Sequence, residues 1–350
     1  MKKIIAVVLS AFFILQFFCG ITVSASDFSE GNYKGLFDYF ISDDEVTIIK
    51  INSSLTSLTI PSKVEGYPVT SIAAEAGQYS KLTSVKFPNT LKLIDDSAFK
   101  YSKLTEINIP ASVETIGDNA FEFNYGVKSV TLSEGLRSIG ENAFNQCNLF
   151  SSITIPSTVD YIGKSAFELY FNDIKIIIKS MKIDIGYMLF GSGSSIYAYE
   201  NSDAALYAVK NGVKFTSLGK FTGVQSYHSN IYGYKNSKLV SGKKTFNGKL
   251  YYFDKSGKAR KGFVKMKSGD IYYFSKKTKN LGQAVTGWVK KDGKKYYLQT
   301  SGENKYKAAK GWMKIKGERY YFNSDGTMAT GKTTIKGKTY FLDKNGILKK

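Results

Sequence analysis

The sequence predicts a repeat protein of mainly β structure, in which two different solenoids follow one another. Three observations support this prediction. An Ala-Phe pair recurs at intervals of 22 or 23 residues, with its phenylalanines at Phe99, Phe121, Phe144 and Phe167. Aromatic doublets recur later in the chain, from Tyr251-Tyr252 to Tyr340-Phe341. The charge also divides near one boundary, since residues 220–350 hold 31 Lys or Arg against 7 Asp or Glu.

The first 25 residues have the pattern of a secretory signal peptide. Two lysines precede an apolar run over residues 4–18, and Val23-Ser24-Ala25 provides the small residues at which signal peptidase cuts. We therefore expect a secreted chain with residues 1–25 removed and no membrane span left. Cleavage leaves Cys147 as the remaining cysteine, so an internal disulfide cannot form and the repeats must supply the stability.

Each unit of the first array predicts a short strand, a turn and a return to the interior. Residues 104–110 align with residues 150–156, and both segments end in a proline, which cannot donate a hydrogen bond to a sheet. A period near 23 residues is typical of leucine-rich repeats. One such unit cannot bury its apolar groups alone, but stacked units form a continuous core. We expect this core to hold Val113, Ile116 and Phe121, and to bury Cys147 as a small hydrophobic residue.

The units resemble the BspA-like leucine-rich repeats of bacterial surface antigens, with the consensus Leu-x-x-Ile-x-Ile-Pro-x-x-Val-x-x-Ile-Gly-x-x-Ala-Phe. The resemblance extends over roughly residues 35–218 and implies a domain over 26–218 with a hairpin cap at its start and a strand–helix–strand cap at its end. It also implies adhesion or recognition of a protein partner that the sequence does not identify. The candidate protein-binding face consists of outward strand positions, Lys86, Asn108, Thr131 and Thr154. A solvated sheet face is the alternative for the same residues.

The second array, over residues 243–350, predicts a solenoid of β-hairpins. Each doublet follows a turn signal, such as Asn247-Gly248 or Asp292-Gly293, in which both central residues need a positive φ. A glycine–aromatic pair opens several units, as in Gly287-Trp288 and Gly311-Trp312. We expect residues 219–242 to form a polar linker between the arrays, and the whole chain to be a monomer.

The hairpin pattern resembles the cell-wall-binding repeats of choline-binding proteins, glucan-binding domains and clostridial toxin repeats. The resemblance implies an aromatic cage that holds a quaternary ammonium by cation–π attraction, with one wall a tryptophan directly before the doublet. That position holds Lys295 and Arg319 in two units, which favours a sugar or a wall polyanion. Choline-dependent anchoring is the alternative. The candidate wall- or carbohydrate-binding residues are Trp288, Tyr296, Tyr297, Trp312, Tyr320, Tyr321 and Tyr340.

The basic charge of the second array favours cell-wall glycan or teichoic acid as its partner. Only Arg260 and Arg319 are arginines there, and lysine suits diffuse attraction to phosphates better than bidentate recognition. Export and the scarcity of arginine argue against nucleic acid. The chain carries no LPxTG-like sorting motif, so we expect non-covalent retention at the cell wall.

We expect no enzyme activity, cofactor or metal. The one histidine, His228, lies in the expected linker, and no Ser-His-Asp, Cys-His or metal-ligand set can be assembled from the sequence. The adjacent carboxylates Asp43-Asp44 and Asp95-Asp96 are expected to be turn residues. The alternatives are an accessory protein of a wall hydrolase, because wall-binding repeats often accompany such enzymes, and a toxin or glucan-binding role.

Overall fold

A computed structural model describes residues 29–148, 150–169, 173–187 and 193–349. The expected signal peptide lies outside these residues. The chain divides into two compact units, of which the first runs to Ala198 and includes Asp203–Thr216, and the second contains Tyr199–Ser202 and the chain from Ser217 onward. Within the described residues, no helix is long and apolar enough to cross a membrane.

The first unit opens with an antiparallel cap. Strand β1 (Ser29–Tyr33) pairs with β2 (Phe37–Ser42), which pairs with β3 (Glu45–Ile51). The β2–β3 turn is tight because Asp43 and Asp44 both adopt positive φ angles, of 51° and 60°. Strand β3 then pairs in parallel with β6 (Tyr67–Ile72). The short strand β5 (Lys63–Val64) pairs antiparallel with the first residues of β6. The cap hairpin therefore continues directly into the repeat array, as the family resemblance implied.

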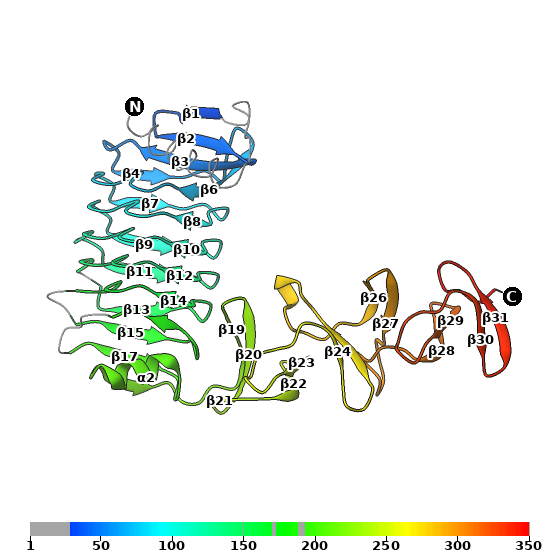
Figure 1. The fold of residues 1–350 in the computed structure, drawn as a ribbon. Coiled ribbons are helices and arrows are strands. Elements are labelled where there is room, and N and C mark those ends of the chain that lie inside the picture. The colour runs from blue at the N-terminus through cyan, green and yellow to red at the C-terminus, as the bar shows by residue number, and fades with distance from the viewer. Residues whose placement is uncertain (1–28, 149, 170–172, 188–192, 350) are drawn as a thin grey trace, which may run out of the picture. The chain divides into compact units, whose positions relative to one another are not determined.

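Two series of parallel strands run along the first unit (Figure 1). One series follows β6 and occupies the Ile-Gly slot of the repeat: β8 (Leu93–Ile94), β10 (Thr115–Ile116), β12 (Ser138–Ile139), β14 (Tyr161–Ile162) and β16 (Asp184–Ile185). The other occupies the slot before the proline: β4 (Ser57–Thr59), β7 (Ser84–Lys86), β9 (Glu106–Ile109), β11 (Ser129–Leu132), β13 (Ser152–Ile155) and β15 (Lys175–Ile178). The repeat predicted from the sequence is therefore the repeat of the solenoid.

A ladder of phenylalanine rings forms the spine of the first unit's core. Phe99, Phe121, Phe144 and Phe167 stack in order, with ring centres 5.6, 5.3 and 5.5 Å apart. All four are buried, as are Val113 and Ile116. This confirms the expected core.

Cys147 lies in the same core, where its thiol donates a hydrogen bond of 3.3 Å to the Phe121 carbonyl oxygen. Its complete burial raises the pKa of the thiol well above its ordinary range, because the thiolate would lose its hydration. The residue therefore behaves as the small buried hydrophobic residue that we expected.

A strand–helix–strand cap ends the first unit, as the resemblance implied. Strand β17 (Ser195–Ala198) pairs with β15 and with β18 (Lys214–Ser217), and helix α2 (Asp203–Lys210) lies between the two strands in sequence. Ala204 and Ala208 of the helix are buried against the core. The helix thereby covers apolar surface that an open solenoid end would expose.

The expected linker is folded, which corrects our prediction for residues 219–242. They contain β19 (Gly223–Tyr227), β20 (Asn230–Lys235) and β21 (Lys238–Leu239), which form an antiparallel sheet. Val224, Ile231 and Val240 from this segment pack against the buried Tyr251 and Phe253 of the next hairpin. We predicted a linker because the segment is polar on average. Its few apolar residues nevertheless form a small core with the next hairpin.

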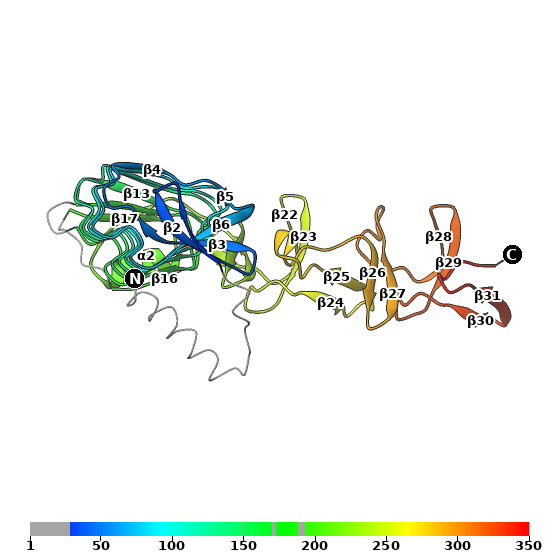
Figure 2. The same ribbon diagram turned by 90° about the horizontal axis from the view of Figure 1, so that it is seen from above.

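Hairpins follow one another along residues 242–342, as predicted from the turn signals (Figures 1 and 2). They are β22 (Gly242–Phe246) with β23 (Lys249–Phe253), β24 (Gly262–Lys265) with β25 (Ile271–Phe274), β26 (Gly287–Lys291) with β27 (Lys294–Leu298), β28 (Gly311–Ile315) with β29 (Glu318–Phe322), and β30 (Gly331–Ile335) with β31 (Lys338–Leu342). A short 3₁₀ turn, η2 (Thr278–Asn280), follows β25.

The residue after each doublet is the constant buried position of this array. It is Phe253, Phe274, Leu298, Phe322 or Leu342. The residue before the doublet joins neighbouring repeats through its carbonyl oxygen. The Lys295 oxygen accepts a hydrogen bond of 2.8 Å from the Met328 N–H, and the Arg319 oxygen accepts one of 2.9 Å from the Leu348 N–H. The backbone at this position is therefore structural, whereas the side chains of Lys295 and Arg319 are exposed.

Candidate wall-binding site and candidate protein-binding face

Aromatic residues of the second unit gather in corners between consecutive hairpins. In each corner, the aromatic residue after a strand-opening glycine faces its cross-strand tyrosine and the first tyrosine of the next doublet. Such corners within residues 263–340 are Phe263 with Tyr273 and Tyr296, Trp288 with Tyr297 and Tyr320, and Trp312 with Tyr321 and Tyr340. Ring centres in contact are 4.4 to 5.3 Å apart. The corners contain every residue predicted for wall binding.

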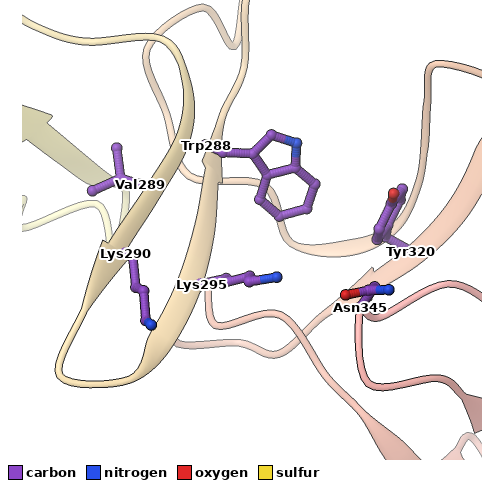
Figure 3. Close-up of a pocket in the computed structure, with 6 residues that line it drawn as sticks. All are labelled: Trp288, Val289, Lys290, Lys295, Tyr320 and Asn345. Carbon is purple, nitrogen blue, oxygen red and sulfur yellow. The ribbon is translucent and has the colours of Figure 1, made fainter.

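The Trp288 corner opens into a hollow of about 340 Å³ (Figure 3). The indole is 44% exposed, and in Figure 3 it projects toward Tyr320. Lys295 extends beneath the indole, with its amino group directed toward Tyr320 and Asn345. The hollow therefore combines aromatic faces with an ammonium group and an amide. Such a site can hold a ligand that joins an apolar or cationic part to an anion.

The Trp312 corner differs in what covers its indole. The Arg319 guanidinium carbon lies 5.0 Å from the centre of the Trp312 ring. Tyr321 and Tyr340 meet the same indole edge-on, at 66° and 72° to its plane. The sequence indicated that a cation replaces the tryptophan before this doublet, but it could not indicate that the cation lies over the neighbouring indole.

Phe263 and Tyr273 of the first corner were missed by sequence reasoning, although Tyr296 of the same corner was predicted. Phe263 contacts Tyr273 at 4.9 Å and Tyr296 at 4.4 Å between ring centres. The Lys291 amino group lies 5.7 Å from the centre of the Phe263 ring. The signal that could have found this corner was present, because Gly262-Phe263 occupies the slot of Gly287-Trp288.

Two corner tyrosines, Tyr296 and Tyr320, keep their protons. Burial raises the pKa of Tyr320, and the nearby carboxylates of Glu318 and Asp343 raise it further. Burial likewise raises the pKa of Tyr296. Both hydroxyls are therefore neutral at physiological pH and can donate hydrogen bonds to an anionic ligand.

The candidate protein-binding residues of the first unit lie exposed on adjacent strands. Lys86 pairs in register with Thr59, and Asn108 pairs with Thr131. Thr154 stands on β13 and is exposed as well. Thr154 pairs in register with Ile177, which pairs with Tyr197 on the next strand. Both of these residues are half-buried. The outward column is therefore polar at one end and apolar at the other.

A second column of the first unit, in which Tyr79 is exposed and Tyr101 and Phe123 are half-buried, was not foreseen. Tyr79, Tyr101 and Phe123 stack with ring centres 5.0 and 4.5 Å apart, and all three adopt positive φ angles. Bulky residues rarely occupy this conformation. The Lys100 amino group lies 5.6 Å from the centre of the Phe123 ring and forms an ion pair of 2.6 Å with Glu122. The signal was an aromatic residue two positions after the Ala-Phe pair, at Tyr101 and Phe123.

The acidic turn residues have structural partners. The Asp96 carboxylate accepts a hydrogen bond of 2.7 Å from the Asp118 N–H, and the Asp118 carboxylate accepts one of 2.7 Å from the Glu141 N–H. They thus bridge successive turns of the solenoid. His228 stands in the β19–β20 turn with its ring 4.2 Å from that of Tyr227, rather than in an unfolded linker. The described residues contain no group of three His, Cys, Asp or Glu that could hold a metal.

Comparisons with known protein families match both units. The BspA type leucine rich repeat region matches residues 70–197 in six copies. The choline-binding repeat matches residues 309–348, and the cell wall binding repeat matches residues 244–259 and 286–303. No curated protein matches the chain.

Solved structures resemble parts of the chain. Choline binding protein F from Streptococcus pneumoniae is 31% identical, with 37% of this chain and 41% of that chain covered and a TM-score of 0.31. CbpJ from Streptococcus pneumoniae TIGR4 is 26% identical, with 37% and 42% covered and a TM-score of 0.31. The Treponema pallidum (T. pallidum) leucine rich repeat protein is 20% identical, with 51% and 71% covered and a TM-score of 0.29. The chain spans about two fifths of the two streptococcal proteins.

Proposed function

We propose that this chain, a BspA-type leucine-rich repeat region followed by choline-binding and cell-wall-binding repeats, is a non-enzymatic cell-surface protein held non-covalently at the wall. The second unit attaches to teichoic acid, and the first unit presents a face to a protein partner. The observation that carries the attachment is the open Trp288 corner, in which aromatic faces stand beside the Lys295 ammonium group. A phosphate polymer with an apolar or onium substituent satisfies both features.

Charge supports a polyanion as the ligand. Residues 220–350 carry 31 basic against 7 acidic side chains, which is far more than solubility requires. Diffuse attraction brings the second unit to the wall, and the Trp288 corner supplies the short-range contact. Neither contribution alone accounts for both the lysines and the repeated geometry of the corners along the array.

Neutral wall glycan is the second candidate ligand. It is favoured by Asn345, whose amide lines the Trp288 hollow and can exchange hydrogen bonds with sugar hydroxyls. Aromatic faces accept the apolar side of a sugar ring as readily as an onium group. The two ligands differ in phosphate, which only teichoic acid carries.

The test is co-sedimentation of the mature chain with purified walls, before and after the phosphate polymer is removed. Trp288→Ala should lower binding to intact walls. Phe341→Ala is the matched control, since Phe341 is an exposed aromatic residue opposite Lys332 rather than in a corner. If the chain no longer binds walls from which the phosphate polymer has been removed, teichoic acid is the ligand. If binding to those walls is unchanged, the ligand is glycan. Equal binding by the two variants and the unaltered chain would remove the corner from the proposal.

The protein-recognition role rests on the exposed column that contains Lys86, Asn108, Thr131 and Thr154. These residues lie on consecutive strands, so one flat partner surface could reach all of them. The experiment is chemical cross-linking from a single cysteine placed at Asn108, with mass spectrometry of the captured protein. Capture that is unchanged when the cysteine is moved to Ser138, on the other series of strands, would count against this face.

A further inference from the structure

The positions of Lys295 and Arg319 are equivalent in successive repeats. Each residue precedes a tyrosine doublet and pairs across its hairpin with a lysine, Lys290 or Lys314. Each backbone carbonyl is fixed by a hydrogen bond from a later repeat. Both side chains project from the same place on the array, and each can reach a tryptophan corner.

Arg319 uses that reach to cover the Trp312 indole. Its guanidinium carbon stands 5.0 Å from the ring centre, a distance typical of a cation–π contact. A guanidinium is planar and weakly hydrated, so it stacks on aromatic rings more readily than an ammonium does. Among the described residues Arg319 forms no ion pair, which leaves the indole as the contact that holds its charge.

The Trp288 corner is built alike but stays open. Its tyrosines, Tyr297 and Tyr320, occupy the places of Tyr321 and Tyr340 in the other corner. Within the part of the chain that the structure describes, Lys295 lines the hollow without a cation–π contact to Trp288. Trp288 is correspondingly exposed, whereas Trp312 is half-buried.

We propose that Arg319 is an internal occupant of the Trp312 corner, which excludes an external cation there and leaves the Trp288 corner as the tryptophan site for an onium ligand. The proposal rests on the proposed wall-binding function of the corners and names which of them the ligand enters. Exclusion comes from the guanidinium, which fills the space over the Trp312 indole face, whereas the Lys295 ammonium group lines its corner without covering the Trp288 indole. Replacing Arg319 with a shorter neutral residue uncovers the Trp312 face.

The two tryptophans allow each corner to be observed separately. The full mature chain is labelled with 5-fluorotryptophan, so that Trp288 and Trp312 each give one ¹⁹F resonance, and is titrated with choline chloride. In the unaltered chain the Trp288 resonance should shift with choline, whereas the Trp312 resonance should respond only at about tenfold higher concentration or more. In Arg319→Gln, the Trp312 resonance should respond in the same range as Trp288. Trp288→Phe and Trp312→Phe assign the two resonances.

Lys314→Gln is the matched control, because Lys314 is the exposed cross-strand neighbour of Arg319 and its loss changes the net charge equally. It should leave the Trp312 resonance as unresponsive as before. The proposal is overturned if Trp312 responds like Trp288 in the unaltered chain, or if Arg319→Gln fails to make it respond. An unresponsive Trp288 would instead count against an onium ligand for the open corner. In that case the response of the Trp312 resonance to choline in Arg319→Gln would decide the proposal on Arg319: a response would support it, and no response would overturn it.

Discussion

The ring of Phe121 stacks on the ring of Phe144 in the next repeat, with centres 5.3 Å apart and 10° between their planes. Phe121 is also stacked on Phe99 at 5.6 Å, so its removal breaks the ladder on both sides. We predict that Phe121→Ala lowers the unfolding free energy of the first unit by about 3–5 kcal/mol, the cost of a buried phenylalanine truncated to alanine. Urea unfolding followed by far-ultraviolet circular dichroism measures this loss.

The second unit provides an internal reference for that measurement. Trp288 and Trp312 both lie there, so tryptophan fluorescence reports the unfolding of the second unit alone. Its midpoint should not change in Phe121→Ala. Tyr79→Ala, at a 66% exposed aromatic position, should cost the first unit far less. Equal losses for Phe121→Ala and Tyr79→Ala would contradict the assignment of the core.

Repetition explains why most of the fold could be predicted from the sequence. An error at one unit is corrected by the others, so the proline and Ala-Phe slots identified inward residues such as Ile107 and Phe121 correctly. The turn residues likewise identified the hairpins correctly. Asn247 and Asp292, like the glycines that follow them, adopt the positive φ that a tight hairpin turn requires. The prediction for residues 219–242 was wrong because this segment has neither the proline and Ala-Phe pattern nor an aromatic doublet. Their hairpin replaces the doublet with Tyr232 and Tyr234 on either side of a glycine.

The site was less predictable, because it depends on contacts between repeats. Sequence reasoning found the aromatic residues, and the resemblance implied a cage between neighbouring hairpins, but the residue types alone do not show that Trp288 contacts a tyrosine 32 positions later. It identified Arg319 as a cation in place of a cage wall, but side-chain direction decides whether such a cation closes a corner or lines it. That direction depends on how the side chains pack within the β28–β29 hairpin, which the residue types alone do not determine.

The buried Cys147 leads to a prediction about reactivity. A thiolate is the reactive form, and burial raises the pKa of this thiol far above neutral. In the chain without residues 1–25, we expect a thiol reagent to modify Cys147 only as fast as the first unit opens. Mass spectrometry after timed exposure, with and without urea, measures this. The thermal transition of the first unit should be the same with and without reductant. Rapid labelling in the absence of urea would show that the thiol is accessible in the folded state.

Hydrogen-bonded carboxylates in the second unit predict a pH dependence. Hydrogen bonds from Ser256, Ser268 and Thr327 lower the pKa values of Asp254, Asp270 and Asp325, respectively. An unfolded aspartate titrates near about pH 3.9, so the unfolded chain takes up protons first as the pH falls. The stability from these bonds is therefore complete above about pH 4 and is lost as the pH falls toward the lowered values.

The measurement is the urea midpoint of the second unit, followed by tryptophan fluorescence at neutral pH and through the range below about pH 4. The midpoint should fall with pH in the unaltered chain and fall less steeply in Asp325→Asn, which lacks one titrating carboxylate. Phe341→Ala, which alters an exposed aromatic residue and no carboxylate, is the control and should keep the original slope. A midpoint that rises on acidification would contradict the stabilising role of these three carboxylates.

The exposed column of the first unit predicts that bulky labels act on binding and not on folding. Single cysteines at Lys86, Asn108, Thr131 and Thr154, each carrying a large maleimide label, should block capture of the protein partner. Substitutions at exposed positions usually change the unfolding free energy by less than about 0.5 kcal/mol, so the melting temperature should scarcely change. Differential scanning fluorimetry of each labelled chain measures this. Strong destabilisation by the labels would mean that these side chains do not point outward.

The last prediction separates charge from stacking in wall attachment. At 0.15 M salt the screening length is about 8 Å and at 1 M it is about 3 Å, so lysine–phosphate attraction weakens sharply while aromatic stacking persists. We expect 1 M salt to weaken wall binding by the mature chain without abolishing it. Trp288→Ala together with Trp312→Ala should remove most of the salt-resistant part. Trp288→Ala alone should remove more of it than Trp312→Ala, because Arg319 already covers the second indole.

Free choline should elute little protein, since it lacks the phosphate that the lysines attract. Complete elution by choline, with no effect of salt, would show that an aromatic cage dominates despite Lys295 and Arg319.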